Sequence, residues 1–399
     1  MIKGFDGIRA LAVIVVFFNH WTVFGRSYHT GDYGVWTFFV LSGFLIIRAL
    51  HKDRMRVEKG ASAKSAILEF YGRRALRIFP VYYATLLALT LVSLVHPLPN
   101  WDFPSALAHY TYTTNIYIGE IKGAFIGWFS HFWSLAVEQQ FYLFAAPLFL
   151  LVPSRLSVVI CGAVSLLGLA VWSAMHLSGA PDIAIYTNSL IGFGMITMGG
   201  LAALLLSSAP GQGSRSWLAA GVLAAITLLP PLVFAAAGRG VDLGWIKLLA
   251  VPLAAVLLAE IFLNQQSVLV KILEWTPLRY LGVISYGFYI FHNMIPRTIL
   301  HVASEKSGID IPIQFDAPFG FAVAVVLAHF SWILLERPLL SLKKTYATRT
   351  DPRRRRRCGR TERPHETERN KVFVCTAQKS FTRARRLHSL IPGVGELCR

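Results

Sequence analysis

Ten apolar segments recur along the chain, each long enough, at about twenty residues, to cross the roughly 30 Å hydrocarbon core of a bilayer. Hydrophobic residues make up 54% of the 399 residues and charged residues only 15%, whereas a soluble domain is about a quarter charged. The pattern therefore predicts an all-α integral membrane protein with about ten transmembrane helices. The predicted spans are 8–24, 33–50, 78–96, 131–152, 156–176, 185–206, 216–236, 244–263, 281–300 and 318–336.

The first segment, 8–24, follows Lys3 and Arg9 and therefore resembles a secretory signal peptide. No small-residue cleavage site follows it, and a second apolar segment begins at residue 33. We interpret the segment as a helix that is retained in the protein.

Lys and Arg are distributed unequally among the loops. The loop 51–77 holds eight of them, while the loop 97–130 holds only Lys122. Because cytoplasmic loops carry the excess of positive charge, this distribution places 51–77 and both chain termini in the cytoplasm. An even number of spans satisfies that arrangement, and the inner cell membrane is the expected location.

The C-terminal region 341–399 contains 17 Lys and Arg against 5 Asp and Glu, so most of the net charge of +18 lies there. It includes five consecutive arginines, 353–357, and has no helical or strand period. We expect a polytopic membrane domain at 1–340 and a disordered, basic cytoplasmic tail at 341–399 that is attracted to anionic lipid headgroups. The composition of the tail also fits an altered reading frame, so we assign no function to it.

Several classes of site are absent from the sequence. None of the four cysteines has metal-ligand spacing, and HExxH, GxxxxGK[ST] and GxSxG motifs do not occur. We therefore expect no metal, no permanently bound cofactor and no nucleic-acid partner. No feature of the sequence indicates an oligomeric state.

The first span contains two ionisable residues, Arg9 and His20, that are expensive to bury in a membrane. The eleven positions from Arg9 to His20 rotate the helix by three full turns and about 20° more, and they advance it by roughly 16 Å. Both side chains are therefore predicted on one wall of a cavity, with Arg9 at the cytoplasmic mouth and His20 deeper. The alternative is that Arg9 reaches the headgroups and His20 only bonds a neighbouring helix.

Two further spans carry polar residues on one helical face. In the fourth span these are His131, Ser134, Glu138 and Tyr142, and in the ninth they are Ser285, Tyr289 and His292. Such faces turn inward to a wet cavity or to a polar partner. The alternative is a hydrogen-bonding network that fixes only the packing of the helices.

Arg74 and Arg77 lie at positions i and i+3 just before the third span. Positive-inside bias alone accounts for part of this charge. Two guanidiniums on one helical face also suit a bidentate contact with phosphate, which predicts a phosphorylated cytoplasmic ligand.

Taken together, five elements in this order resemble the membrane-bound acyltransferase-3 family, which O-acylates sugars and related hydroxyl acceptors. The first is an opening Arg-x10-His helix. The likeness covers about residues 2–340, and its five elements are 5–20, 38–45, 74–80, 133–142 and 284–292.

The resemblance implies that the essential histidine is His20 and that Arg9, Arg74 and Arg77 serve the donor. His20 would be the general base, although a transient acyl-imidazole is an alternative. The donor would be a cytoplasmic acyl-coenzyme A, with acetyl as the acyl group by the habit of the family. The acceptor would be a hydroxyl of a cell-surface glycan sugar or of a glycosylated metabolite.

The remaining polar residues complete the predicted site. Glu138 is predicted to orient His20 or an acceptor hydroxyl. The predicted substrate-binding residues, besides the three arginines, are Ser134, Tyr142, Ser285, Tyr289 and His292.

Two features depart from the family pattern. The Arg/Asp-containing segment expected near residues 186–188 is missing. No esterase-like domain follows the tenth span, so we expect any relay of the acyl group to such a domain to need a separate protein.

Two other classes of function fit parts of the sequence. A transporter or flippase of a lipid-linked sugar would use the inward polar residues as a path, and its signature would be paired broken helices in both halves. The only candidate is Pro230-Pro231, without an earlier counterpart. A different membrane acyltransferase class would use His292, with Asn293 beside it.

Overall fold

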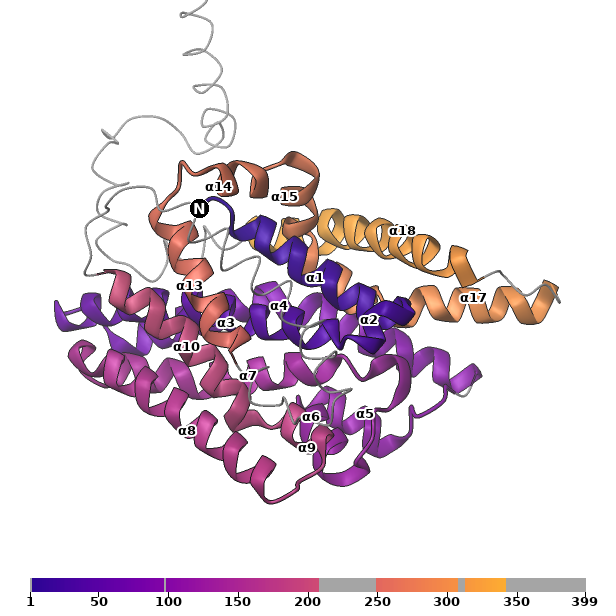
Figure 1. Cartoon of the computed structure of the whole chain (residues 1–399), viewed down its shortest axis with the longest axis horizontal. Coiled ribbons are helices and arrows are strands. Elements are labelled where there is room, and N and C mark those ends of the chain that lie inside the picture. The colour runs from indigo at the N-terminus through magenta and orange to yellow at the C-terminus, as the bar shows by residue number, and fades with distance from the viewer. Residues whose placement is uncertain (1, 97, 208–248, 308–312, 342–399) are drawn as a thin grey trace, which may run out of the picture. The chain divides into compact units, whose positions relative to one another are not determined.

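The computed structural model describes residues 2–96, 98–207, 249–307 and 313–341. All regular elements in these ranges are helices (Figure 1). In chain order they are α1 Phe5–Trp21, α2 Val23–Ser27, α3 Thr30–Glu58, α4 Ala63–Val95, α5 Phe103–Tyr110, α6 Thr114–Ile116, the π-helix Tyr117–Lys122, the 3-10 helix Gly127–Phe129, α7 Phe132–Leu151, the 3-10 helix Ser154–Leu156, α8 Ser157–Leu177, α9 Asp182–Thr187, α10 Ser189–Ser207, α13 Ala250–Leu263, α14 Val268–Leu273, α15 Thr276–Val283, α16 Ser285–Phe291, α17 Met294–Ser307, α18 Ile313–Ser331, the π-helix Trp332–Glu336 and α19 Arg337–Ser341.

Six stretches of helix in the described ranges are long and apolar enough to cross a membrane: Thr30–Glu58, Ala63–Val95, Gly127–Leu151, Ser154–Leu177, Ser189–Leu206 and Phe315–Ser341. They coincide with six of the ten predicted spans. The protein is therefore a helical, multi-pass membrane protein, as the sequence predicts.

The other four predicted spans have different outcomes. The segment 8–24 forms α1, of 17 residues, which ends at Trp21 before the short helix α2. The predicted span 216–236 lies outside the described residues, as does the tail 342–399. Of the predicted span 244–263, the described part is α13, whose 14 residues are about 21 Å long.

The predicted ninth span, 281–300, is not one continuous helix. The chain forms the separate helices α15, α16 and α17 there, with breaks before Ser285 and at His292 and Asn293. The prediction of a continuous helix was wrong because apolar composition does not report whether side chains from other helices can replace backbone hydrogen bonds.

Side chains satisfy the carbonyl groups that the second break leaves without helical partners. The Trp21 indole donates to the carbonyl of His292 at 2.9 Å, and His131 Nε2 lies 3.1 Å from the carbonyl of Ile290. Irregular backbone inside a membrane is tolerated where protein groups satisfy it in this way. The break is therefore held by the same helices that carry the predicted site.

Helices α3 and α10 approach closely because glycines lie at their contact (Figure 1). A β-carbon on Gly43 would lie 1.6 Å from the carbonyl oxygen of Ile196, and one on Gly199 would lie 1.8 Å from that of Val40. Small residues let membrane helices pack with their backbones in contact. This contact fixes α3, which lines both cavities described below.

We expect Gly43→Ala to destabilise the protein by about 1–3 kcal/mol, because the added methyl group must push the two backbones apart. The measurement is the thermal unfolding of detergent-solubilised protein. Gly162→Ala in α8 is the control, since no atom lies within 4 Å of its β-carbon position. Equal melting temperatures for Gly43→Ala and the wild type would contradict the proposed contact.

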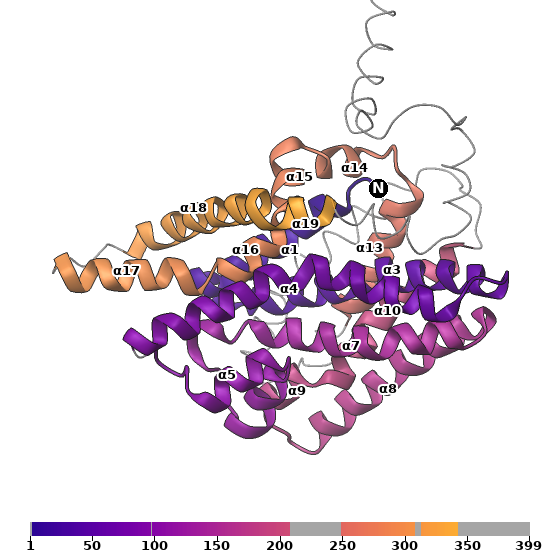
Figure 2. The same cartoon turned by 180° about the vertical axis from the view of Figure 1, so that it is seen from behind.

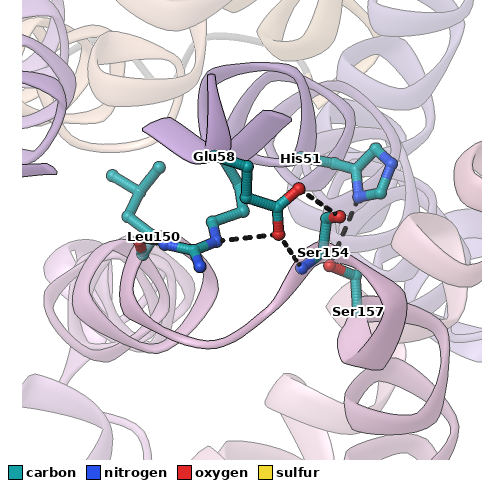
Figure 3. Close-up of polar contacts among 6 residues, drawn as sticks. His51, Glu58, Leu150, Ser154 and Ser157 are labelled. Atoms are coloured by element: carbon teal, nitrogen blue, oxygen red, sulfur yellow. Dashed lines mark hydrogen bonds and ion pairs between the residues drawn. The ribbon is translucent and has the colours of Figure 1, made fainter. Parts of the chain in front are cut away.

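The C-terminal end of α3 is tied to the turn between α7 and α8 (Figure 3). The Glu58 carboxylate accepts the backbone N–H and the hydroxyl of Ser154, both at 2.7 Å. Arg54 donates to Glu58 at 3.3 Å and to the carbonyl of Leu150 at 2.8 Å. These bonds hold the long helix α3 at its exposed end, beyond the apolar contacts with α10.

Helices α17 and α18 lie side by side in both views (Figure 1 and Figure 2). Helix α1 packs along α3, while its first turn meets α14 and α15 and its last residue, Trp21, meets α18 at Gly320. Its two ends therefore meet different sets of helices, and a cavity lies at each end.

Candidate functional site

The first cavity, the arginine chamber, has a volume of about 130 Å³ and is enclosed by α1, α3, α4, α7 and α16. It brings together eight of the ten predicted site residues, although they come from four helices. These eight are Arg9, Arg74, Arg77, Ser134, Glu138, Tyr142, Ser285 and Tyr289.

The three arginines of this chamber differ in their partners. Arg9 pairs with Asp6 at 2.5 Å. Arg74 lies over the Tyr142 ring at 5.4 Å, and neither it nor Arg77 pairs with a carboxylate in the described part of the chain. Guanidiniums without an ion-pair partner in the described chain can make hydrogen bonds to an anion.

Glu138 belongs to the arginine chamber and not to the surroundings of His20. Its carboxylate accepts hydrogen bonds from the hydroxyls of Ser42 and Tyr142. Of the two roles predicted for Glu138, a bond to His20 is absent from the described hydrogen bonds, and contact with an acceptor hydroxyl stays a prediction. Glu138 holds the α3 and α7 walls of the chamber together beside the arginines.

The second cavity, the histidine chamber, has a volume of about 390 Å³ and lies at the C-terminal end of α1. It is lined by the segments around α2 and the start of α3, by residues 125–133 and by the break after α16. Its lining is mixed, with charged, amide and aromatic side chains: Asn19, His20, Arg26, His29, Asp32, Phe125, Trp128, Ser130, His131, Trp133, Tyr186, Tyr289, Asn293 and Arg297.

The backbone of His20 is fixed while its ring faces the chamber. Its carbonyl accepts hydrogen bonds from Arg297 and, at 3.1 Å, from Arg26. No ring nitrogen of His20 is hydrogen-bonded among the described contacts, and the side chain is only partly buried. An imidazole held in this way is free to bond a group that enters the chamber.

Two more imidazoles pack near His20. The His292 ring lies 5.2 Å from the His20 ring and the His131 ring lies 6.4 Å from it, measured between ring centres. His292 is fully buried and lines neither chamber, and its Nδ1 donates to the carbonyl of Tyr289 at 2.7 Å. The prediction that His292 binds substrate is not supported by this position. His292 instead packs against the His20 ring from the protein interior.

The helical period of the first span predicts one cavity with Arg9 and His20 on its wall. In the structure the two residues line different chambers, because α1 meets different helices at its two ends. Val35 and Tyr289 line both chambers and so form the partition between them.

Several residues of the histidine chamber were missed as site residues. The Arg297 guanidinium donates to the Asn293 side-chain oxygen at 2.9 Å and also to the His20 carbonyl. The Asn293 side-chain amide donates to the carbonyl of Trp128 at 3.1 Å. The only sequence signal was a charge close to the end of an apolar segment, which also fits an ordinary span boundary. Only the break in the ninth span brings these groups to His20.

Apolar helices around two chambers lined by charged and polar groups define a polytopic membrane protein with a polar site among its helices. The chain belongs to the acyltransferase-3 family, because the family model, described as an acyltransferase domain, matches residues 2–337. The resemblance inferred from the five sequence elements is therefore confirmed. No solved structure matches the chain.

Curated relatives of this chain carry names of O-acetyltransferases. The peptidoglycan O-acetyltransferase OatA of Listeria monocytogenes is 29% identical over 85% of this chain and 56% of its own length. The putative peptidoglycan O-acetyltransferase YrhL of Bacillus subtilis is 27% identical over 85% and 55%. The O-acetyltransferase OatA of Staphylococcus aureus is 26% identical over 85% and 57%. The chain thus spans little more than half the length of these relatives.

Proposed function

We propose that the chain transfers an acetyl group from acetyl-coenzyme A to a hydroxyl group of a cell-surface glycan. The observation that carries the proposal is the pair of adjoining chambers, one with three arginines and one with a free imidazole. A donor with phosphate groups and an acceptor with hydroxyl groups need such different surroundings.

The donor is assigned to the arginine chamber. A volume of about 130 Å³ is below the 300–1,000 Å³ of typical ligand pockets, so only the thioester end fits inside. The phosphates then remain at the mouth, where Arg74 and Arg77 have no carboxylate partner in the described chain. Arg9, already paired with Asp6, contributes positive charge near the thioester.

The acceptor is assigned to the histidine chamber. Its aromatic rings suit the apolar faces of a sugar, and its amide and charged groups suit the hydroxyls. Trp128 and Tyr186 are among these rings, and Asp32 and Asn293 are among the polar groups. The names of the relatives favour a glycan over a glycosylated metabolite as the acceptor.

His20 acts as the general base in this proposal. It takes the proton of the acceptor hydroxyl while the oxygen attacks the thioester carbonyl carbon. The carbon–sulfur bond then breaks, and the proton passes to the coenzyme A thiolate. The thioester supplies the driving force, so no nucleotide hydrolysis is needed.

The proposed orientation places the two substrates on opposite sides of the membrane. The arginine chamber lies at the end of α1 that positive-inside bias assigns to the cytoplasm, where acetyl-coenzyme A is available. The histidine chamber then faces the outer side, which is consistent with a glycan acceptor at the inner cell membrane.

Membrane vesicles that contain the protein, supplied with acetyl-labelled coenzyme A, are expected to gain label in their glycan as an ester that mild base releases. The same ester mass should disappear from the surface glycans of cells that lack the gene. A transporter of a lipid-linked sugar would change the amount of glycan without consuming acetyl-coenzyme A. Unlabelled glycan in vesicles that contain folded protein would therefore reject the proposal.

A further inference from the structure

Tyr289 is the aromatic side chain of the partition between the two chambers. It lies on α16, three residues before the break at His292, and is only 6% exposed. Its ring borders the arginine chamber on one side and the histidine chamber on the other.

Two hydrogen-bond contacts hold the Tyr289 hydroxyl in place. The hydroxyl donates to the carbonyl of His131 at 2.9 Å and lies 2.6 Å from the hydroxyl of Ser134. Both partners belong to the start of α7, so the tyrosine connects α16 to α7 across the partition. The proton of the Tyr289 hydroxyl therefore has an acceptor at the start of α7.

Ring contacts restrict the side chain further. The Phe38 ring packs edge-on against Tyr289 with 6.0 Å between centres, and the His131 and His292 rings lie 5.5 and 5.6 Å away. The ring is therefore held from several directions and cannot swing aside without breaking these contacts. The Tyr289 ring is therefore a fixed part of the boundary between the two chambers.

We propose that the Tyr289 ring sets the length of the acyl group, a role that rests on the proposed transferase function. A thioester entering from the arginines directs its acyl end toward the ring. An acetyl group then places its methyl against the ring and its carbonyl carbon beside the edge of the ring, where the acceptor oxygen reaches it from the histidine chamber. A longer chain meets the ring before its carbonyl carbon reaches that position.

The chemistry at the boundary is the same for every acyl group. The acceptor oxygen forms a bond to the carbonyl carbon, the carbon–sulfur bond breaks, and the hydroxyl proton passes through His20 to the thiolate. Tyr289 takes no part in these bonds and acts only through the space it fills. One added methylene group changes discrimination by about 10–200-fold in such a pocket.

The test compares acetyl-, butanoyl- and hexanoyl-coenzyme A as donors in inverted membrane vesicles, with the mass of the ester on the vesicle glycan identifying the acyl group. We expect wild-type protein to prefer acetyl over butanoyl. Tyr289→Ala should lower that ratio of kcat/KM by at least about 10-fold. Tyr289→Phe keeps the ring and should retain the wild-type ratio.

A second substitution covers the case in which alanine at this position prevents folding. Tyr289→Leu fills part of the space and should give an intermediate ratio, with butanoyl accepted before hexanoyl. Displacement of labelled acetyl-coenzyme A by butanoyl-coenzyme A from purified protein gives the same comparison without turnover.

The outcomes separate this inference from the proposed function. Acetyl transfer by the wild type with an unchanged ratio in Tyr289→Ala and Tyr289→Leu overturns the role of the ring and leaves the transferase intact. An equal loss of preference in Tyr289→Phe also overturns it, because the hydroxyl would then be decisive. Absence of any transfer by folded wild-type protein overturns both.

Discussion

Replacement of His20 by alanine is expected to lower the rate of acyl transfer by about 10²–10⁴-fold, which is the usual contribution of a positioned general base. The expectation follows from a ring that faces the histidine chamber while Arg26 and Arg297 hold its backbone carbonyl. The measurement is the initial rate of label transfer from acetyl-coenzyme A to glycan in vesicles with matched protein content.

The control for this substitution is His176→Ala. His176 stacks on Trp172 in α8, with ring centres 4.8 Å apart, and lines neither chamber. We expect its activity to remain near that of the wild type. Full activity of an inserted, monodisperse His20→Ala protein would remove His20 from the mechanism.

The double substitution Arg74→Gln with Arg77→Gln is expected to raise the KM for acetyl-coenzyme A by at least about 100-fold and to change the acceptor KM little. A hydrogen bond to a charged group contributes about 1.5–3 kcal/mol, so the loss of two phosphate contacts has a large effect on donor binding. Donor and acceptor KM values are measured separately at saturating concentration of the other substrate.

Arg73 supplies a matched control on the same helix. It pairs with Asp53 at 3.0 Å and with Glu69 at 3.1 Å, and it does not line the arginine chamber. Arg73→Gln removes the same charge from the same end of α4 and should leave the donor KM near the wild-type value. An equal rise in both variants would mean that the arginines act only through topology or general charge.

The sequence predicted the helical membrane fold because the apolar segments are long and contain few charges. Six of the predicted spans coincide with long apolar helices of the structure. The helical repeat of the sequence also placed Ser134, Glu138 and Tyr142 on one face of α7, and all three line the arginine chamber. Periodicity along a single helix was sufficient for these residues because each side chain turns toward the helices that pack there.

The positions of Arg9, His20 and His292 could not be predicted in the same way. The period of α1 placed the first two residues on one stripe, but a cavity is bounded by every helix that packs around it. The broken helix at 292–293 directs other groups to the two ends of α1 and buries His292. That break depends on bonds from Trp21 and His131, which are distant in sequence.

The amino-acid sequence by itself determined that this protein is a helical membrane protein of the acyltransferase-3 family, since hydrocarbon thickness and short motifs are read along one segment at a time. Only the tertiary structure decided that the charged and polar residues divide between two chambers with Tyr289 between them. The physical reason is that the partition forms where side chains of α3 and α16 meet in space, and the sequence of one helix does not specify where another helix packs against it.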